Sequence, residues 1–213
     1  MLLLADNLAT RAWYVSDFVP ELLDFVLITW AAFRLDPSVK LEQRITNQFA
    51  DALEAAYEDA GKRWFVVPDM KRTDPKTGKE IARHDLRFYH RDISGQRLYF
   101  IFECKRLNVV NKKKKIVANP ADYRAGMMKF VNDTYGAGHP CGAMIGYVMN
   151  GNLGSAQKTI KHLIHKNHAS LRIIAGGPYT ASPLMPKYPY NGETKHDRKN
   201  GCFVLYHILL AAN

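Results

Sequence analysis

Cysteine is scarce in this sequence, and so are the marks of secreted and membrane proteins. The 213 residues include three cysteines, Cys104, Cys141 and Cys202. Their odd number and wide spacing predict neither a disulfide framework nor a zinc motif. No run reaches the ~18 apolar residues of a transmembrane helix, and Asp6 and Arg11 come too early for a signal peptide. We therefore expect a protein of the reducing cytoplasm with no membrane partner.

Two common hydrolase signatures are also missing. No GxxxxGK loop followed by Ser or Thr occurs, which excludes ATP hydrolysis by the P-loop route. No GxSxG elbow occurs either, which excludes that form of serine catalysis. The chain has no internal repeat.

Hydrophobic residues are plentiful, at 47%, and charged residues make up 23%. This composition supports a real core and a single domain over residues 1–213. The net charge of +10 favours a polyanionic partner such as nucleic acid or an anionic membrane surface, although a basic protein with no such partner fits it too. The chain has no strongly amphipathic basic helix with exposed aromatic residues, so the membrane surface is the weaker reading.

Hydrophobic periodicity, together with the positions of glycine, proline and capping residues, predicts an α/β fold with a mixed central sheet flanked by helices. From 36 to 149 the expected order is helix, strand, strand, strand, helix, strand. This stretch forms a core over 36–150, preceded by a helical extension over 1–35 and completed by 151–213. The predicted elements are helices at 20–33, 36–60, 119–136 and 153–168, and strands at 64–68, 84–90, 97–105, 141–149, 171–175 and 202–211, with a hairpin turn at 92–96 and loops at 73–80 and 176–200. Asp36 as N-cap, with Pro37 at the first helical position, predicts the start of the second helix.

The most informative segment is FECKR at 102–106. It ends an apolar strand, on which Glu103 and Lys105 lie side by side on the face opposite to Phe102. A neighbouring acid and lysine are costly to bury on such a strand unless they have partners. Asp85 begins the preceding strand, and a hairpin can place it next to Glu103. The alternative is an exposed ion pair between Glu103 and Lys105 at a strand end.

Two convergent carboxylates make a hard oxygen site that suits Mg²⁺, for which Mn²⁺ can substitute. Such a metal lowers the pKa of a bound water and neutralises charge on a scissile phosphate. The ammonium of Lys105 could orient that water or stabilise the developing pentavalent phosphate. The pattern therefore favours phosphodiester hydrolysis.

Asp85 followed by Glu103-Cys104-Lys105, within the predicted order of helices and strands, resembles the PD-(D/E)XK nuclease superfamily, which has the restriction-endonuclease-like fold. The resemblance implies hydrolysis of DNA, less often RNA. It implies that Asp85 and Glu103 are metal ligands, that the backbone carbonyl of Cys104 is a third, and that Lys105 is the catalytic lysine. His84 stands where the family name has proline.

Members of that superfamily commonly add an acid from the first core helix, where Glu42, Glu54 and Glu58 are the candidates. Glu42 precedes Ile45 by one helical turn and so shares its apolar stripe, whereas Glu54 lies about 180° around the helix. Glu42 is therefore predicted to face inward. The alternative is a first-turn glutamate that favours the helix dipole.

Other basic residues are candidates for nucleic-acid contact. The run Lys112, Lys113, Lys114 and Lys115 must lie in solvent or against a polyanion, because four adjacent ammonium groups cannot be buried together. Lys129, on the helix after the motif, is a candidate for contact with backbone phosphate, although a solvated helix face is the better interpretation of its pattern.

The segment before the last strand alternates Thr194, His196 and Arg198, and a subset of the same superfamily looks similar there. This resemblance implies substrate contact by His196 and Arg198. His162 and His165 are spaced to allow zinc binding, but they lack cysteines or a flanking acid. Phosphate contact or a solvated helix face is the better interpretation of those two histidines.

The leading hypothesis is a Mg²⁺-dependent DNA endonuclease. Family analogy alone places it as an effector of prokaryotic defence or of a mobile element. The chain has no obvious sequence-reading domain, so we expect a protein partner for targeting or activation, and many members of the superfamily form homodimers that cut both strands. The alternative is a catalytically idle nuclease fold that binds nucleic acid or assembles with a partner. Three retained charged residues, Asp85, Glu103 and Lys105, argue against an idle site.

Overall fold

The structure, a computed structural model, describes residues 12–36, 38–60, 64–73, 77–78, 80–90, 98–110, 113 and 115–212. Its elements in chain order are η2 (Tyr14–Phe18), α2 (Val19–Ala32), α3 (Glu42–Ala60), β1 (Trp64–Thr73), β2 (Glu80–His90), β3 (Tyr99–Leu107), β4 (Val109–Val110), β5 (Ile116–Val117), α4 (Pro120–Val131), β6 (Cys141–Val148), α5 (Leu153–Lys166), β7 (Thr180–Ala181), β8 (Gly192–Arg198) and β9 (Gly201–Ala211).

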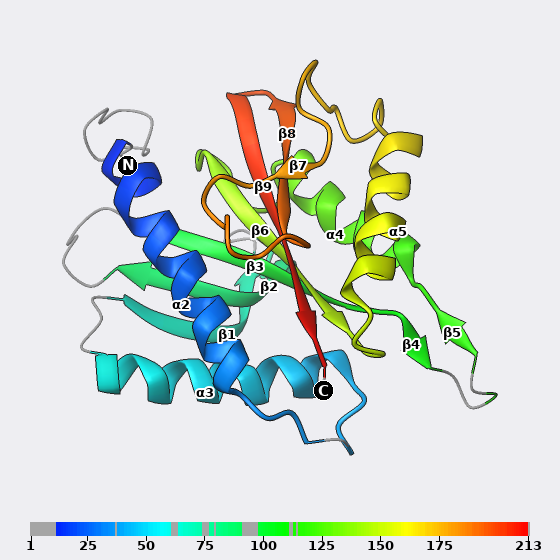
Figure 1. Cartoon of the computed structure of the whole chain (residues 1–213). Helices are drawn as coiled ribbons and strands as arrows, with labels where there is room; N and C mark the ends of the chain where they lie inside the picture. The colour runs from blue at the N-terminus through cyan, green and yellow to red at the C-terminus, as the bar shows by residue number, and fades with distance from the viewer. Residues whose placement is uncertain are drawn as a thin grey trace.

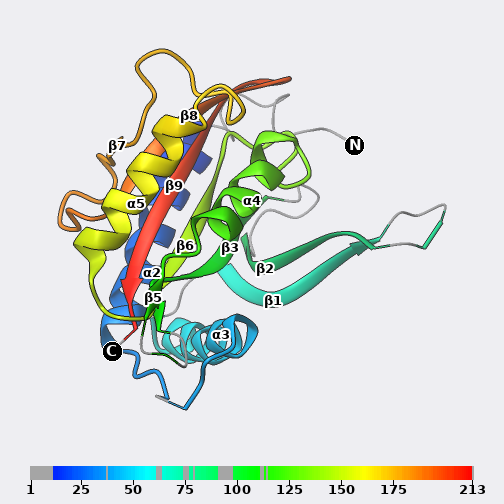
Figure 2. The same ribbon diagram turned by 90° about the vertical axis from the view of Figure 1, so that its right-hand side faces the viewer.

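One mixed sheet forms the centre of the molecule, with the strand order β1-β2-β3-β6-β9-β8-β7. The strands β3, β6 and β9 run parallel, and the remaining pairs are antiparallel. Helices α2 and α3 cover one face, and α4 and α5 cover the other (Figures 1 and 2). The predicted α/β class, the mixed sheet and the flanking helices are confirmed.

Two hydrophobic clusters pack against the two faces of the sheet. Phe100 and Phe102 belong to the cluster on the side of α2 and α3, whereas Ile101 belongs to the one beside α4 and α5. This alternation follows from the period of two in a strand. The middle strand β6 is buried throughout, as expected for a parallel strand covered on both faces. Tyr14 shares its cluster with Leu210, so the N-terminal helix packs into the same core as the last strand.

The first core helix starts later than predicted. Asp36 was expected to cap a helix, but α3 begins at Glu42. The carboxylate of Asp36 instead accepts the N–H of Ser38 at 2.8 Å, and the N–H of Val39 donates to the Asp36 carbonyl at 2.9 Å. These bonds close a local turn, which competes with helix initiation at Asx residues. Pro37, the other half of the predicted start, lies outside the described residues.

The C-terminal part also departs from the prediction. The expected strand at 171–175 is a single bridge between Ile173 and His196. The expected loop at 176–200 contains β7 and the seven residues of β8. The pattern did not predict β8 because its sequence, GETKHDR, is polar and lacks the apolar alternation of a half-buried strand. Its pairing with β9 supplies the backbone hydrogen bonds.

Strands β2 and β3 separate before either of them ends. Their pairing runs from Tyr89 opposite Tyr99 to Leu86 opposite Phe102, and β2 then continues to Glu80 paired with β1. The hairpin of β1 and β2 therefore projects from the body of the sheet (Figure 2). The turn expected between β2 and β3, at 92–96, lies outside the described residues. No helix among the described residues is both long and apolar enough to cross a membrane.

Candidate functional site: a cluster of carboxylates and lysines

The site forms where β2 leaves β3. Extending their register by one residue places Asp85 opposite Glu103. Because the backbone ladder between β2 and β3 has ended there, the N–H of Cys104 donates instead to the side chain of Asp85, at 2.7 Å from Oδ2. The predicted hairpin thus brings the two carboxylates together at the point of separation.

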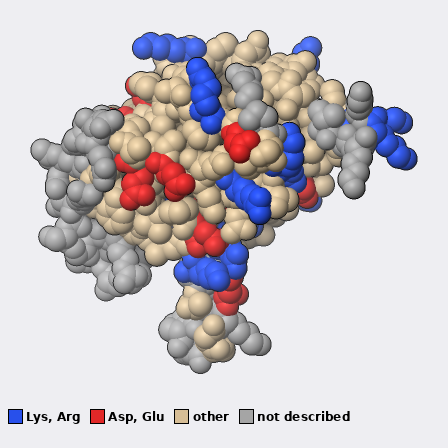
Figure 3. All heavy atoms as spheres, turned by 90° about the horizontal axis from the view of Figure 1, so that it is seen from below, with Lys and Arg blue, Asp and Glu red and all other residues tan. Residues whose placement is uncertain are grey.

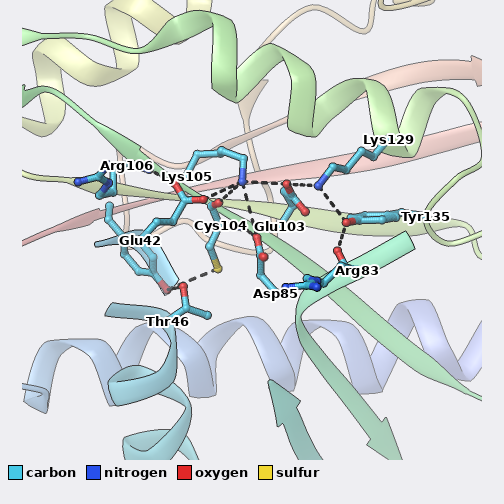
Figure 4. A network of polar contacts seen from close by, with 11 residues as sticks. Glu42, Thr46, Arg83, Asp85, Glu103, Cys104, Lys105, Arg106, Lys129 and Tyr135 are labelled. Atoms are coloured by element: carbon cyan, nitrogen blue, oxygen red, sulfur yellow. Dashed lines mark hydrogen bonds and ion pairs between the residues drawn. The ribbon is translucent and has the colours of Figure 1, made fainter. Parts of the chain in front are cut away.

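The ammonium of Lys105 lies at the centre of the cluster (Figure 4). Its Nζ lies 2.9 Å from Oε1 of Glu103 and 3.8 Å from Oδ2 of Asp85. It also donates to the carbonyl oxygen of Cys104 at 2.6 Å. Three oxygen atoms of the motif therefore surround one cation. The alternative of an exposed pair at a strand end is wrong, since Glu103 is fully buried and Lys105 is 15% exposed.

Glu42 is the inward-facing acid of α3, as the helical phase predicted. Its Oε1 accepts from Lys105 Nζ at 2.9 Å, and its Oε2 accepts the N–H of Arg106 at 2.9 Å. Glu42 is also the first residue of α3, so a favourable dipole contribution accompanies the contact. Glu54 lies exposed on α3, and the side chain of Glu58 lies outside the described residues.

Glu103 is held beneath α4. A Cβ at Gly126 would lie 3.0 Å from Cγ of Glu103 and 2.7 Å from Cε of Met144, so a larger residue there would have to displace both side chains. Oε1 of Glu103 accepts from two ammonium groups, whereas Oε2 is buried and has no hydrogen-bond partner among the described residues. An unpaired buried carboxylate oxygen is costly unless a cation completes it.

Lys129 and Tyr135 form a second part of the site. Lys129 Nζ donates to Oε1 of Glu103 at 2.7 Å and to the hydroxyl of Tyr135 at 3.0 Å. That hydroxyl in turn donates to the carbonyl of Arg83, which ties the loop after α4 to β2. Sequence reasoning gave Lys129 a phosphate contact and missed Tyr135. The spacing of Lys129 one helical turn beyond Gly126 is the signal that links it to Glu103.

The electrostatics of the cluster reflect a surplus of carboxylates. Burial, and then the charge of Glu103, raises the pKa of Asp85 to about 7. Burial alone would lower the pKa of Lys105, but the three surrounding carboxylates outweigh burial and raise it above its usual value. Three acids against two ammonium groups leave one excess negative charge, which protonation or a further cation would remove.

Cys104 takes part through its backbone. Its carbonyl oxygen points into the cluster, whereas its thiol is buried on the opposite side, where the hydroxyl of Tyr147 donates to Sγ at 3.4 Å. Burial raises the pKa of this thiol well above its usual value, so it is not a thiolate ligand. Among the described residues, no three side chains of His, Cys, Asp or Glu are arranged to hold a metal ion. Any metal here would need the carbonyl in addition to Asp85 and Glu103.

The other predicted basic contacts lie away from the cluster. Lys113 and Lys115 are exposed between β4 and β5, while Lys112 and Lys114 lie outside the described residues. His162 and His165 are exposed on α5, in keeping with a solvated or phosphate-contacting face.

His196 does not face a surface. It is fully buried, and its Nδ1 must carry the proton because it faces the carbonyl of Leu171 at 2.7 Å. Its Nε2 therefore accepts from the hydroxyl of Thr194 at 2.7 Å. That hydroxyl accepts from Nε2 of His207 at 2.9 Å, and Nδ1 of His207 accepts from the hydroxyl of Tyr123 at 2.9 Å. The chain of bonds is complete with both histidines neutral, which indicates a structural role.

The side chain of Arg198 is also buried, and its contacts are with other residues of the chain. Its guanidinium pairs with Asp133, donates to the carbonyl of Gly136 at 3.1 Å and lies 4.2 Å from the ring centroid of Phe203. The side chain is 3% exposed. The interpretation of His196 and Arg198 as substrate contacts therefore does not fit their burial, and the alternation that suggested it reflects one buried face of β8.

We expect acid to destabilise the fold through this network. Burial lowers the pKa of His196 from 6.5 to about 4 and that of His207 to about 3. The unfolded chain thus binds more protons than the folded one below pH 6.5, so the free energy of unfolding falls as pH drops from there toward 4. Urea titrations at several pH values measure this, and a flat profile would contradict it.

The variant His196→Asn distinguishes a structural role of His196 from contact with substrate. It should lower the free energy of unfolding by about 2 kcal/mol at neutral pH and weaken the acid dependence of stability. If the sequence-based hypothesis of a nuclease holds, a structural role for His196 predicts that cleavage survives below the melting temperature of this variant. Unchanged stability with lost cleavage would instead favour substrate contact.

Comparison of the chain with protein-family models, with curated proteins and with solved structures finds no match. The site is therefore interpreted from its own geometry.

Proposed function

We propose that the chain is a Mg²⁺-dependent nuclease with a restriction-endonuclease-like core, and that DNA is its substrate. One observation carries the proposal: four residues chosen from the sequence, Glu42, Asp85, Glu103 and Lys105, meet at one point. Apart from the two-residue strands β4 and β5, which lie between β3 and α4, the order α3, β1, β2, β3, α4, β6 is the one that the resemblance to the PD-(D/E)XK superfamily implies. The net charge of +10 supports a polyanionic substrate.

The residues present fit Mg²⁺. Asp85, Glu103 and the carbonyl of Cys104 offer hard oxygen ligands, and Mg²⁺ commonly takes one or two carboxylates and completes its shell with water and substrate oxygens. The buried Oε2 of Glu103 has no hydrogen-bond partner among the described residues, and the cluster carries one surplus negative charge. A divalent cation would satisfy both. When bound, it supplies a water of lowered pKa and offsets the charge of the phosphate.

The side chains around these ligands have distinct tasks. Lys105 lies against the oxygens that would hold the metal, so its ammonium would stabilise negative charge developing on the phosphate. Glu42 holds Lys105 from the side of α3, through a contact of 2.9 Å. Lys129, supported by Tyr135, fixes Glu103 from the side of α4. Each charged side chain of the cluster thus has at least one hydrogen-bond or ion-pair partner in the absence of substrate.

A plasmid-nicking experiment tests the proposal. Supercoiled DNA is incubated with the protein in Mg²⁺ and, in parallel, in EDTA, at a pH of about 8 so that Asp85 is ionised. A single-stranded RNA and a single-stranded DNA are run beside it. We expect nicking in Mg²⁺ and in Mn²⁺ and none in EDTA.

Cleavage confined to RNA would keep the nuclease and overturn the choice of DNA. Binding without cleavage under every metal condition would favour the alternative of a catalytically idle subunit. An activating protein partner remains an expectation from the lack of an obvious sequence-reading domain, and a homodimer remains an expectation of the resemblance.

A further inference from the structure

A groove lies between α2 and α3, away from the carboxylate cluster. Its volume is about 560 Å³. Its apolar lining comes from Phe25 and Ile28 of α2, Phe33 just beyond it, and Ala52, Ala55 and Ala56 of α3. The three alanines fall on one face of α3 and leave room that larger side chains would fill. Ile28 is 57% exposed, which is unusual for an isoleucine on a core helix.

The rim of the groove is acidic. Glu21 and Asp24 line it from α2. Asp51 and Glu54 do not line the groove, but they are exposed on α3 next in sequence to the lining residues Ala52 and Ala55. Residues 12–60 contain nine Asp and Glu against three Lys and Arg, a net charge of −6, within a chain whose total is +10. Seen from the side of α3, several acidic side chains gather in one group on the side away from β4 and β5, while other acidic side chains lie among basic ones (Figure 3).

The negative charge around the groove indicates which kind of molecule can bind there. The acidic rim repels nucleic acid and anionic lipid, so neither fits the groove. A groove between two helices with an apolar floor and a charged rim is a common binding site for an amphipathic helix. We propose that the groove binds a basic amphipathic helix of a partner protein, whose apolar residues enter between α2 and α3 and whose lysines or arginines face Glu21 and Asp24.

A second copy of this chain does not provide such a helix among its described residues. The basic helix α5 buries its apolar residues, among them Ile160, Leu163 and Ile164, in the core. Its exposed face is polar and charged, with Lys158, Lys161 and His165. Because the described part of a second copy offers no such helix, we assign the groove to a helix of a different protein. This inference does not depend on the proposed nuclease activity.

Two designed peptides test the proposal by fluorescence anisotropy. The first is a helix with leucine at positions i, i+3, i+4 and i+7 and lysine on both flanks; the second has the same leucines and glutamate in place of lysine. Ile28→Ser removes the exposed apolar contact, and Asp24→Lys reverses the rim charge. Ile116→Ser is the matched control, because Ile116 is 59% exposed on β5.

We expect the lysine peptide to bind the wild type and Ile116→Ser equally, and to bind Ile28→Ser and Asp24→Lys at least about tenfold more weakly. The glutamate peptide should bind at least about tenfold more weakly to the wild type. Equal binding of the two peptides, equal binding to Ile28→Ser and Ile116→Ser, or no binding at all would overturn the proposal. Self-association that Ile28→Ser abolishes in sedimentation would also overturn it, by making a second copy the occupant. Circular dichroism confirms that each variant folds.

Discussion

Glu103→Gln is expected to lower metal-dependent cleavage by at least about a thousandfold, which is about 4 kcal/mol of transition-state stabilisation. Glutamine has nearly the shape of glutamate but carries no charge and binds a hard divalent cation poorly. It also removes the negative charge that Lys105 and Lys129 share at 2.9 and 2.7 Å. The measurement is the single-turnover rate of plasmid nicking over a series of Mg²⁺ concentrations. Asp85→Ala and Lys105→Ala should abolish cleavage as well.

A second buried glutamate provides the control for this variant. Glu193 on β8 is 7% exposed and accepts a hydrogen bond from Ser182 at 2.8 Å, away from the cluster. Glu193→Gln should cleave at close to the wild-type rate, because it changes a buried carboxylate without touching the site. Wild-type cleavage by a folded Glu103→Gln protein would end the nuclease assignment. Equal losses in both glutamine variants would indicate a general effect of burying an amide.

The core of the site was predictable because it depends on local rules. A strand alternates its faces, so Glu103 and Lys105 had to share one, and a hairpin had to return Asp85 toward Glu103. The phase of a helix likewise distinguished Glu42 from Glu54. Each of these inferences uses spacing along one or two neighbouring elements. In the structure, carboxylate oxygens of Glu42, Asp85 and Glu103 all lie within 4 Å of the ammonium of Lys105.

The missed residues depend on contacts between distant segments. Tyr135 lies in a loop whose position follows from the packing of α4 on β3, and no local pattern encodes that packing. Strand β8 is held by its register with β9 and by the network of Thr194, His196 and His207, so polar residues fill buried positions. Hydrophobic periodicity detects burial only where apolar side chains provide it. The pairing of polar groups with one another is a tertiary property.

Glu42→Gln is expected to lower cleavage by about a hundredfold, whereas Glu54→Gln should change it by less than about twofold. Both substitutions replace one glutamate of α3 by glutamine, so they match in intrinsic helix propensity and in net charge. They differ in contacts. Glu42 binds Lys105 Nζ through Oε1 and the N–H of Arg106 through Oε2, each at 2.9 Å, while Glu54 lies exposed on α3.

The reason for the large effect is the position of the lysine. Glutamine at position 42 still accepts a hydrogen bond through its amide oxygen, but it no longer attracts an ammonium by charge, so Lys105 would be drawn toward Glu103 and Asp85 and would compete there with a metal ion. The decisive measurement compares single-turnover rates for the two variants as Mg²⁺ is raised. A loss in Glu42→Gln that high Mg²⁺ partly reverses supports this competition. Equal rates in the two variants, or a larger loss at position 54, would show that α3 presents a different face to the site.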